Sequence, residues 1–439
     1  MLSSYPNFLI FSGKCTEMVR GTNCFCPIVK GRKQKQTTSE EQMKFNKWTL
    51  GLAAVGAVSL ASAVRADEAK IIPLQTTLAN TTISGYVDTA VQYNAGNQSY
   101  AYSGSIGQPP GTFAGKVDNF SLNDVDIAID KPVDSTPWAA GYHAEFNLGT
   151  DAVGYGFAPT GNQTAVRQAY VVLNTPVGNG ISWKMGVQDD IIGYEGNTDG
   201  ANPNYTRSIG YYLEPTTLLG LVGTYQINSL FTVQAGIADA TAYTFTGGVN
   251  GDGEVSAKTY VGTVAFTAPD SWGFLKGGTA NVGVVANPEK YGQYNYYAGF
   301  TIPTPLSILK VGASFDLVSL NNSYTPGNPN NDSGWVVGGY ANIQATDKLA
   351  FNLRGEVYDL KGAVEPVYSL NNHATDGVGE EFTATVQYNL WANVTSRAEF
   401  RWDHSDTGYP FGGYNNGEGG GGTPVADSFI LALNVIYSF

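Results

Sequence analysis

The sequence predicts an all-β protein, a transmembrane antiparallel β-barrel of about 16 strands with long external loops and short periplasmic turns. Apolar residues recur with a period of two, the connections alternate between short and long, and the final strand ends in an aromatic residue. Only 14% of the residues are charged, and 54 Gly and 27 Tyr are present. Because no run of about 20 apolar residues exists, a bundle of membrane-spanning helices is excluded.

An export signal is predicted before the barrel. Residues 43–66 combine a short basic stretch, an apolar run and closing small residues, the pattern of a secretory signal peptide. Since such signals lie at the start of a chain, we expect translation to begin at Met43, with residues 1–42 an artefact of an upstream start. The exported chain, 67–439, is then free of cysteine, because the sequence has cysteine only at Cys15, Cys24 and Cys26.

Period-two alternation predicts the strands one by one from residue 83 onward. In 393–403, for example, Arg and Glu alternate with apolar and aromatic residues. The predicted strands are 83–93, 120–130, 138–148, 164–174, 181–188, 217–227, 230–239, 257–268, 276–286, 291–302, 307–317, 333–345, 348–358, 381–390, 393–403 and 427–439.

A soluble sandwich also alternates, but strands of about 10 residues match the tilted span of a bilayer. Lipid offers no hydrogen-bond partners, so such strands must close into a ring with apolar residues outward. The inward polar residues then need water, and about sixteen strands leave room for an aqueous lumen. An even strand count places both termini on the periplasmic side.

The last strand carries the clearest single feature. Phe429, Leu431, Leu433, Val435, Tyr437 and the terminal Phe439 share one face. A final aromatic strand that ends in Phe resembles the assembly signal of bacterial outer-membrane proteins. We therefore expect Tyr437 and Phe439 to be read by the barrel-assembly machinery.

The connection 189–216 is unusually long and contains apolar residues that would be out of place in water. We expect it to fold into the barrel and narrow the lumen. Its charged residues are then candidates for the pore constriction: Asp189, Asp190, Glu195 and Arg207.

Strand parity points further charged residues into the lumen. The predicted basic wall consists of Lys184, Lys310, Arg354, Arg397 and Arg401, and the predicted acidic pore-lining residues are Asp88, Glu145, Glu356 and Glu399. Arg167 stays ambiguous, because it shares parity with apolar neighbours. If the acidic loop faces the basic wall, the electric field lies across the pore and selects solutes. The alternative is a set of local pairs, such as Arg354–Glu356 or Arg397–Glu399.

Short motifs along strands four to six carry a family resemblance. The run Gln168-Ala169-Tyr170-Val171, the Gly193-Tyr194-Glu195 triplet and the stretch Asn204-Tyr205-Thr206-Arg207-Ser208 resemble the OmpL-like group of β-barrel porins. The layout over roughly 80–439 also looks like that of general and carbohydrate porins. The resemblance implies a passive channel in the outer membrane of Gram-negative bacteria, in a lipid environment, and more weakly a homotrimer.

Other kinds of function find little support. With 24 basic against 37 acidic residues, nucleic acid is not an expected partner. The 250–254 stretch lacks the full calcium-loop pattern, three histidines leave little room for a metal site, and no nucleophile motif accompanies the His143–Glu145 or His404–Ser405 neighbours. We therefore expect no enzyme activity, cofactor or metal.

The expected function is passive diffusion of small hydrophilic solutes and ions through the outer membrane. The acidic balance suggests a preference for cations, which inward Arg and Lys could reverse locally. Two alternatives remain open. One is a solute-specific channel, for instance for saccharides, with Tyr86, Tyr340 and Tyr358 as an aromatic track. The other is a plugged structural or adhesive barrel.

Overall fold

The computed structural model describes residues 80–95, 116, 118–134, 137–154, 164–240, 258–288, 292–321, 331–361, 377–406 and 426–439. Three sequence expectations concern residues outside these ranges: the start at Met43, the signal peptide over 43–66 and the 250–254 motif. Among the described residues, no helix is long and apolar enough to cross a membrane.

Strands make up almost all of the regular structure. They are β1 (Thr82–Ala95), β2 (Asn119–Lys131), β3 (Ala140–Leu148), β4 (Thr164–Thr175), β5 (Ile181–Asp189), β6 (Thr217–Gln226), β7 (Phe231–Ala240), β8 (Thr259–Thr267), β9 (Thr279–Asn287), β10 (Gln293–Pro303), β11 (Leu309–Asn321), β12 (Asn331–Gln344), β13 (Leu349–Leu360), β14 (Gly377–Trp391), β15 (Val394–Ser405) and β16 (Asp427–Ser438). The described helical segments are η1 (Asp151–Gly154), η2 (Asp199–Ala201), α3 (Ile209–Leu213) and η3 (Asp270–Leu275).

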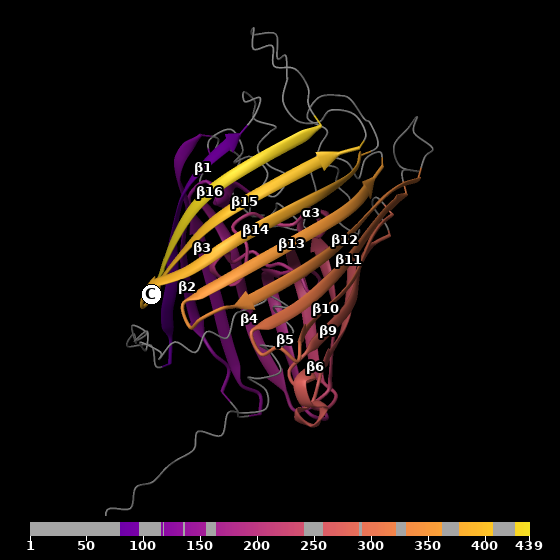
Figure 1. Cartoon of the computed structure of the whole chain (residues 1–439). Helices are drawn as coiled ribbons and strands as arrows, with labels where there is room; N and C mark the ends of the chain where they lie inside the picture. The colour runs from indigo at the N-terminus through magenta and orange to yellow at the C-terminus, as the bar shows by residue number, and fades with distance from the viewer. Residues whose placement is uncertain are drawn as a thin grey trace, which may run out of the picture. The chain divides into compact units, whose positions relative to one another are not determined.

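The strands form one closed antiparallel barrel in which every strand pairs with its neighbours in sequence and β1 pairs with β16. Figure 1 shows the indigo β1 beside the yellow β16, with the strands running obliquely around the wall. In this seam Tyr86 lies opposite Ser438, and Ala95 lies opposite Phe429. The predicted fold class is therefore confirmed, including the sixteen strands. The strand ends differ from the predicted ones by up to four residues: β14 begins at Gly377 instead of 381, and β11 ends at Asn321 instead of 317.

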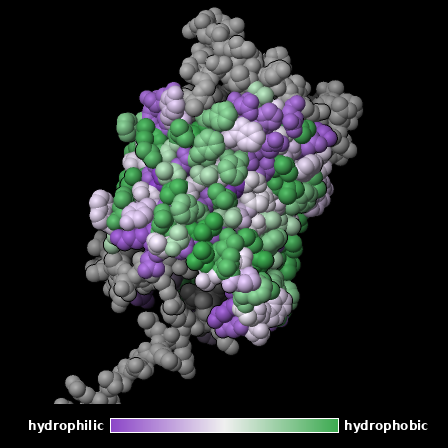
Figure 2. Space-filling model, in the orientation of Figure 1, coloured by the Kyte–Doolittle hydropathy of each residue, from purple (hydrophilic) through white to green (hydrophobic). Residues whose placement is uncertain are grey.

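The two faces of the wall differ as the alternation predicts. On β16 the apolar set from Phe429 to Tyr437 is exposed, whereas the alternating Ile430, Ala432 and Asn434 are buried inside. Figure 2 shows hydrophobic side chains gathered over the middle of the visible outer face, with hydrophilic ones toward its upper and lower edges. An apolar belt with polar edges is the surface that a bilayer requires.

A β-bulge in β4 resolves the ambiguity of Arg167. Glu145 of β3 pairs with Gln168, and Phe146 pairs with Val166, so Arg167 is the extra residue. Because a bulge changes the alternation locally, both Arg167 and Gln168 contact the inward carboxylate of Glu145. Strict parity could not have placed both residues inside.

Phe439 lies at the seam where the barrel closes. Its N–H donates to the Gly85 carbonyl at 2.9 Å, and the Gly85 N–H donates to the Phe439 carbonyl at 3.1 Å.

We expect deletion of Phe439 to lower the amount of folded barrel in the outer membrane, because both the terminal aromatic and this pair of hydrogen bonds are lost. The measurement is the heat-shifted fraction on a gel, with Phe429→Leu as the matched control on the same face. Equal folded fractions in the deletion and the parent would contradict an assembly role.

Candidate functional site: a loop inside the barrel

The connection between β5 and β6, residues 190–216, lies inside the barrel and contacts strands far around the wall. Asn281 of β9 donates to the Ile191 carbonyl at 3.5 Å, and Asn295 of β10 donates to the Leu213 carbonyl at 2.6 Å. On the other side, Asn352 of β13 donates to the Pro203 carbonyl at 2.8 Å. We call this segment the inner loop. Figure 1 shows its short helix α3 behind the strands of the wall.

The first part of the inner loop is held by apolar packing. Ile191, Ile192 and Tyr194 form one buried cluster with inward-facing residues of the wall: Leu218, Val222, Ala238, Val261, Val285, Tyr297 and Tyr340. The ring of Tyr194 stacks on that of Tyr340, with centroids 3.8 Å apart. The lumen wall over β6–β10 is thus locally apolar, because it packs against protein and not against water.

Helix α3 is held in a second cluster. Ile209 and Leu213 pack with Val318, Val336, Tyr358 and Leu360 of β11–β13. The carboxylate of Glu356 accepts from the N–H of Ile209 at 2.6 Å and from that of Gly210 at 3.1 Å. A carboxylate is favourable there because the first N–H groups of a helix lack partners inside the helix.

A third, small cluster crosses the seam of the barrel. Tyr205 packs with Ala90 of β1 and with Ile430 and Ala432 of β16. One side chain of the inner loop therefore contacts both the first and the last strand.

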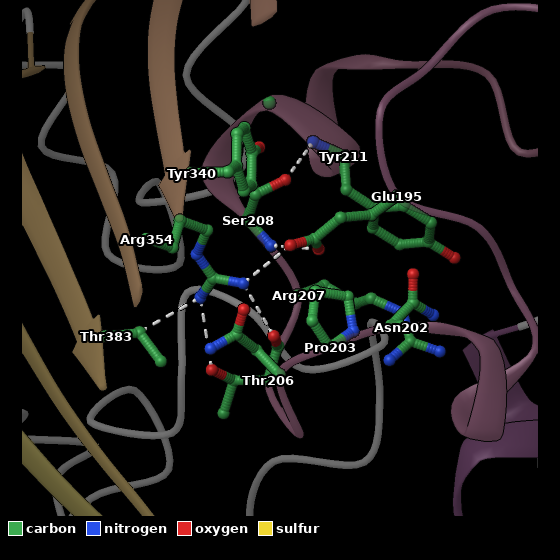
Figure 3. A network of polar contacts seen from close by, with 12 residues as sticks. Glu195, Asn202, Pro203, Thr206, Arg207, Ser208, Tyr211, Tyr340, Arg354 and Thr383 are labelled. Atoms are coloured by element: carbon green, nitrogen blue, oxygen red, sulfur yellow. Dashed lines mark hydrogen bonds and ion pairs between the residues drawn. The ribbon is translucent and has the colours of Figure 1, made fainter. Parts of the chain in front are cut away.

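Arg354 of β13 is the centre of the polar contacts (Figure 3). Its guanidinium donates to Glu195 of the loop at 2.8 Å and to Glu381 of β14 at 3.0 and 3.2 Å. It also donates to the Thr206 carbonyl at 2.7 Å. Arg354 is only 1% exposed, so the carboxylates replace the water that a buried cation loses.

Two neighbouring side chains of β15 hold the next part of the loop. Glu399 accepts from the N–H groups of Tyr205 and Thr206 at 2.5 and 2.9 Å, and from the Thr206 hydroxyl at 2.6 Å. Arg401 is 0% exposed; it pairs with Asp403 at 2.6 Å and donates to the Arg207 carbonyl at 2.6 Å. The wall and the loop thus form one continuous hydrogen-bonded unit.

Of the predicted acidic loop residues, Glu195 meets the predicted basic wall at Arg354, whereas Asp189 pairs with an arginine outside that wall. Asp189 pairs with Arg167 of the adjacent strand β4 at 2.7 Å, and Glu195 touches Arg354 directly. Burial raises the pKa of Asp190 well above its ordinary value. Asp189 and Glu195 are thus each paired with an arginine.

The other predicted basic residues lie in different surroundings. Arg397 donates to the carbonyls of Asn204 at 3.4 Å and Asp199 at 3.1 Å, and not to Glu399 as the local-pair alternative expected. The Lys184 ammonium lies over the Tyr170 ring, 4.6 Å from its centroid. Lys184 and Lys310 are half-buried, and within the described ranges neither of them shows an ion pair.

The remaining predicted charges are buried in local networks. Asp88 accepts hydrogen bonds from Asn123 and Asn434, and Glu145 accepts from Arg167 at 2.7 Å. Arg207 pairs with Asp199 inside the loop at 2.7 Å. Arg354 lies 3.8 Å from Glu356, so this pair of the local-pair alternative is present.

Several residues that hold the loop were missed from the sequence. Glu381 faces inward by simple parity and could have been found; Thr206 carries no local signal, because its partners Glu399 and Arg354 are distant in sequence. His143 lies 3.2 Å from both Asp130 and Glu145, the position of a lumen pair. No group of three or more His, Cys, Asp or Glu in the described part of the chain is arranged to hold a metal ion.

The far end of the inner loop brings two carboxyl groups together. Glu214 follows α3 directly and faces Asp316 of β11. Burial raises the pKa of Glu214 well above its usual range, and the carboxylates of Asp316, Asp190 and Glu195 raise it further. Both Asp316 carboxylate oxygens are buried without a donor from another group, so a proton on Glu214 would complete the contact.

We expect docking of this end to weaken as the pH rises. The undocked Glu214 would ionise near its ordinary pKa of about 4.3, whereas the docked one keeps its proton to higher pH. Between the undocked and the docked pKa of Glu214, the docked loop therefore binds more protons than the undocked one. In that pH range the equilibrium constant for docking falls by less than ten-fold per pH unit. Protease cleavage within 209–216 from pH 4 to 8 measures this, with Glu214→Gln as the variant expected to flatten the profile. An unchanged profile in that variant would refute the assignment.

Comparison with known proteins follows this geometry. A family model described as putative beta-barrel porin-2, OmpL-like, matches residues 80–439. No curated protein sequence matches the chain.

Solved structures share the fold at low sequence identity. The trimer form of OmpT of Vibrio cholerae is 15% identical, with a TM-score of 0.53 over 82% of this chain and 99% of that one. The anion-selective porin of Comamonas acidovorans is 12% identical, with a TM-score of 0.51 over 82% and 99%. The outer-membrane channel DcaP of Acinetobacter baumannii is 13% identical, with a TM-score of 0.55 over 83% and 99%.

The match to the family model covers every described strand, and the neighbours are outer-membrane barrels. The chain therefore belongs to the putative beta-barrel porin-2, OmpL-like family, a family of porin-type barrels of the bacterial outer membrane.

Proposed function

We propose that the protein is a passive channel through which small hydrophilic solutes and ions cross the outer membrane down their gradients. The observation that carries the proposal is a closed barrel of sixteen strands with an apolar outer face and a lumen narrowed by a docked loop. A barrel of this size has room for water beside a loop, whereas about eight strands would be filled by side chains. The proposal includes no covalent chemistry and no cofactor.

The inner loop would act as the size filter, and the charges still exposed to water would select among ions. Most charges at the centre of the lumen are paired, so they contribute little net field. Lys184 and Lys310 are half-buried, and the Asp189 side chain is 36% exposed. These three groups are the candidates to set ion preference.

The test is single-channel conductance of the protein purified from outer membranes, in a planar bilayer, with the reversal potential under a salt gradient. Stable open steps are expected, and the sign of the reversal potential reports whether cations or anions pass more easily. Protein that is folded by its heat-shifted gel mobility and yet gives no steps would overturn the proposal.

A plugged structural barrel is the second candidate, because one observation favours it. The central lumen residues Arg354 and Arg401 are 1% and 0% exposed, so the inner loop covers them completely. The same recording separates the two functions. A saccharide channel has less support, because the tyrosines of the expected aromatic track, Tyr86, Tyr340 and Tyr358, are all buried.

We further propose that the barrel assembles as a homotrimer. OmpT of Vibrio cholerae, a similar barrel, is described in a trimer form. Cross-linking in intact outer membranes is expected to give a band at three times the mass of the chain. A single unlinked band under conditions that cross-link a known trimer would contradict this proposal.

A further inference from the structure

A tight turn inside the inner loop, residues 196–202, is braced by one side chain. Asn202 donates from its amide to the carbonyls of Gly196 at 2.7 Å and Thr198 at 2.8 Å, and its carbonyl oxygen accepts from the Gly196 N–H at 2.9 Å. Asn202 is 1% exposed. Because the Asn202 side chain is buried and both of its polar atoms are hydrogen-bonded, the turn has a defined position within the lumen.

Two glycines of this turn face open space. A Cβ atom added at Gly196 or at Gly200 would meet no atom within 4 Å. Elsewhere in the inner loop the space is taken: a Cβ at Gly210 would lie 2.7 Å from Asp316 Oδ2, and one at Gly193 would collide with Glu214. Gly200 is exposed and Gly196 half-buried. Of the four glycines of the inner loop, Gly196 and Gly200 therefore face open space.

Neither backbone conformation nor packing requires glycine at these two positions. Both lie outside the glycines with positive φ, which include Gly193 at +113°. A larger residue would be neither strained nor crowded at either position. The two glycines therefore leave open a volume beside the turn that larger side chains would fill.

A charged group lies next to this open side. Asn197 donates to Asp189 Oδ1 at 2.9 Å, which ties the turn to the end of β5. The Asp189 side chain is 36% exposed, whereas that of its ion-pair partner Arg167 is 4% exposed. Water and solutes beside the turn thus meet the carboxylate and not the guanidinium.

We propose that solutes cross the constriction along the Gly196 and Gly200 side of this turn, with Asp189 as the charge that they pass and Asn202 as the residue that positions the turn. This inference rests on the proposed channel function and deepens it by naming the route. It follows from the open space at the two glycines and from the unequal exposure of the Asp189–Arg167 pair.

The sequence offers a direct experiment, because residues 80–439 contain no cysteine. In the full chain with Cys15, Cys24 and Cys26 changed to serine, Gly196→Cys and Gly200→Cys each introduce one thiol into the lumen. Sulfonatoethyl methanethiosulfonate then adds a negative charge, and trimethylammonioethyl methanethiosulfonate adds a positive one. Ser229→Cys, in the exposed turn between β6 and β7, is the matched control.

We expect both reagents to lower the conductance of Gly196→Cys and Gly200→Cys channels by about two-fold or more, because each fills the route. The reversal potential should shift in the direction of greater cation selectivity with the negative reagent and of greater anion selectivity with the positive one. Ser229→Cys should react without either effect. In the unlabelled parent background, Asp189→Asn should shift the reversal potential in the direction of greater anion selectivity.

Two results would overturn the inference while leaving the channel function intact. One is complete labelling at both positions, shown by mass, with unchanged conductance and reversal potential. The other is a conducting channel whose thiols at both positions never react in the folded protein. A parent protein that never conducts contradicts the proposed function itself, whatever the thiols do.

Discussion

Replacing Arg354 with methionine is expected to release the inner loop and to cost the barrel about 3–5 kcal/mol, the usual loss when one partner of a buried ion pair is removed. The guanidinium is within 4 Å of three carboxylates, Glu195, Glu356 and Glu381. Methionine fills a similar volume. It leaves Glu195 and Glu356 buried without a counter-charge, and Glu381 keeps only Arg401, 3.8 Å away. They must then take up protons or reach water.

The measurement has two parts. The temperature at which the folded gel band disappears should fall, and the single-channel current should become larger or noisier as the loop leaves the wall. Lys348→Met is the matched control, because Lys348 lies in the exposed turn between β12 and β13 and has no ion pair among the described residues. Parent-like stability and current in Arg354→Met would show that the apolar clusters alone hold the loop.

Changing Glu399 to glutamine is expected to loosen the 203–207 part of the loop by about 1.5–3 kcal/mol, the range for hydrogen bonds to a charged group. The carboxylate accepts from two loop N–H groups and from the hydroxyls of Thr206 and Thr385. Glutamine keeps one acceptor oxygen and replaces the other with a donor. The buried N–H and O–H donors that now bind the carboxylate would then face the NH₂ group of the glutamine side chain.

Limited proteolysis of the folded barrel tests this directly, because cleavage after Arg207 requires the loop to leave the wall. Faster cleavage by trypsin in Glu399→Gln is the expected result. Glu380→Gln, the same chemical change on the outward face of β14, should leave the rate unchanged. Equal rates in all three proteins would remove Glu399 from the set of residues that hold the loop.

The fold could be predicted from the sequence because its signal is local. Alternation within each strand, as in β13 and β15, depends only on neighbouring residues, and it placed Arg354, Arg397 and Arg401 inside. The β4 bulge broke that rule at one residue, and parity left Arg167 ambiguous.

The site was predictable only in part, because its contacts join residues far apart in sequence. Glu399 meets Tyr205 across 194 positions, and Asn352 meets Pro203 across 149. Alternation cannot tell an open lumen from one covered by a loop, since both need inward polar residues. The length of the connection and its apolar residues Ile191, Ile192, Ile209 and Leu213 were the local signs on which the expected inward fold rested.

The small cluster at the seam has a consequence for how the barrel is made. Tyr205 touches Ala90 of β1 and Ile430 of β16, strands whose paired residues stand more than 300 positions apart in the chain. A docked inner loop holds these two edges near each other and lowers the entropy lost when they meet. The inner loop would then also act as a template for the last step of assembly, and loosening it should slow closure of the ring.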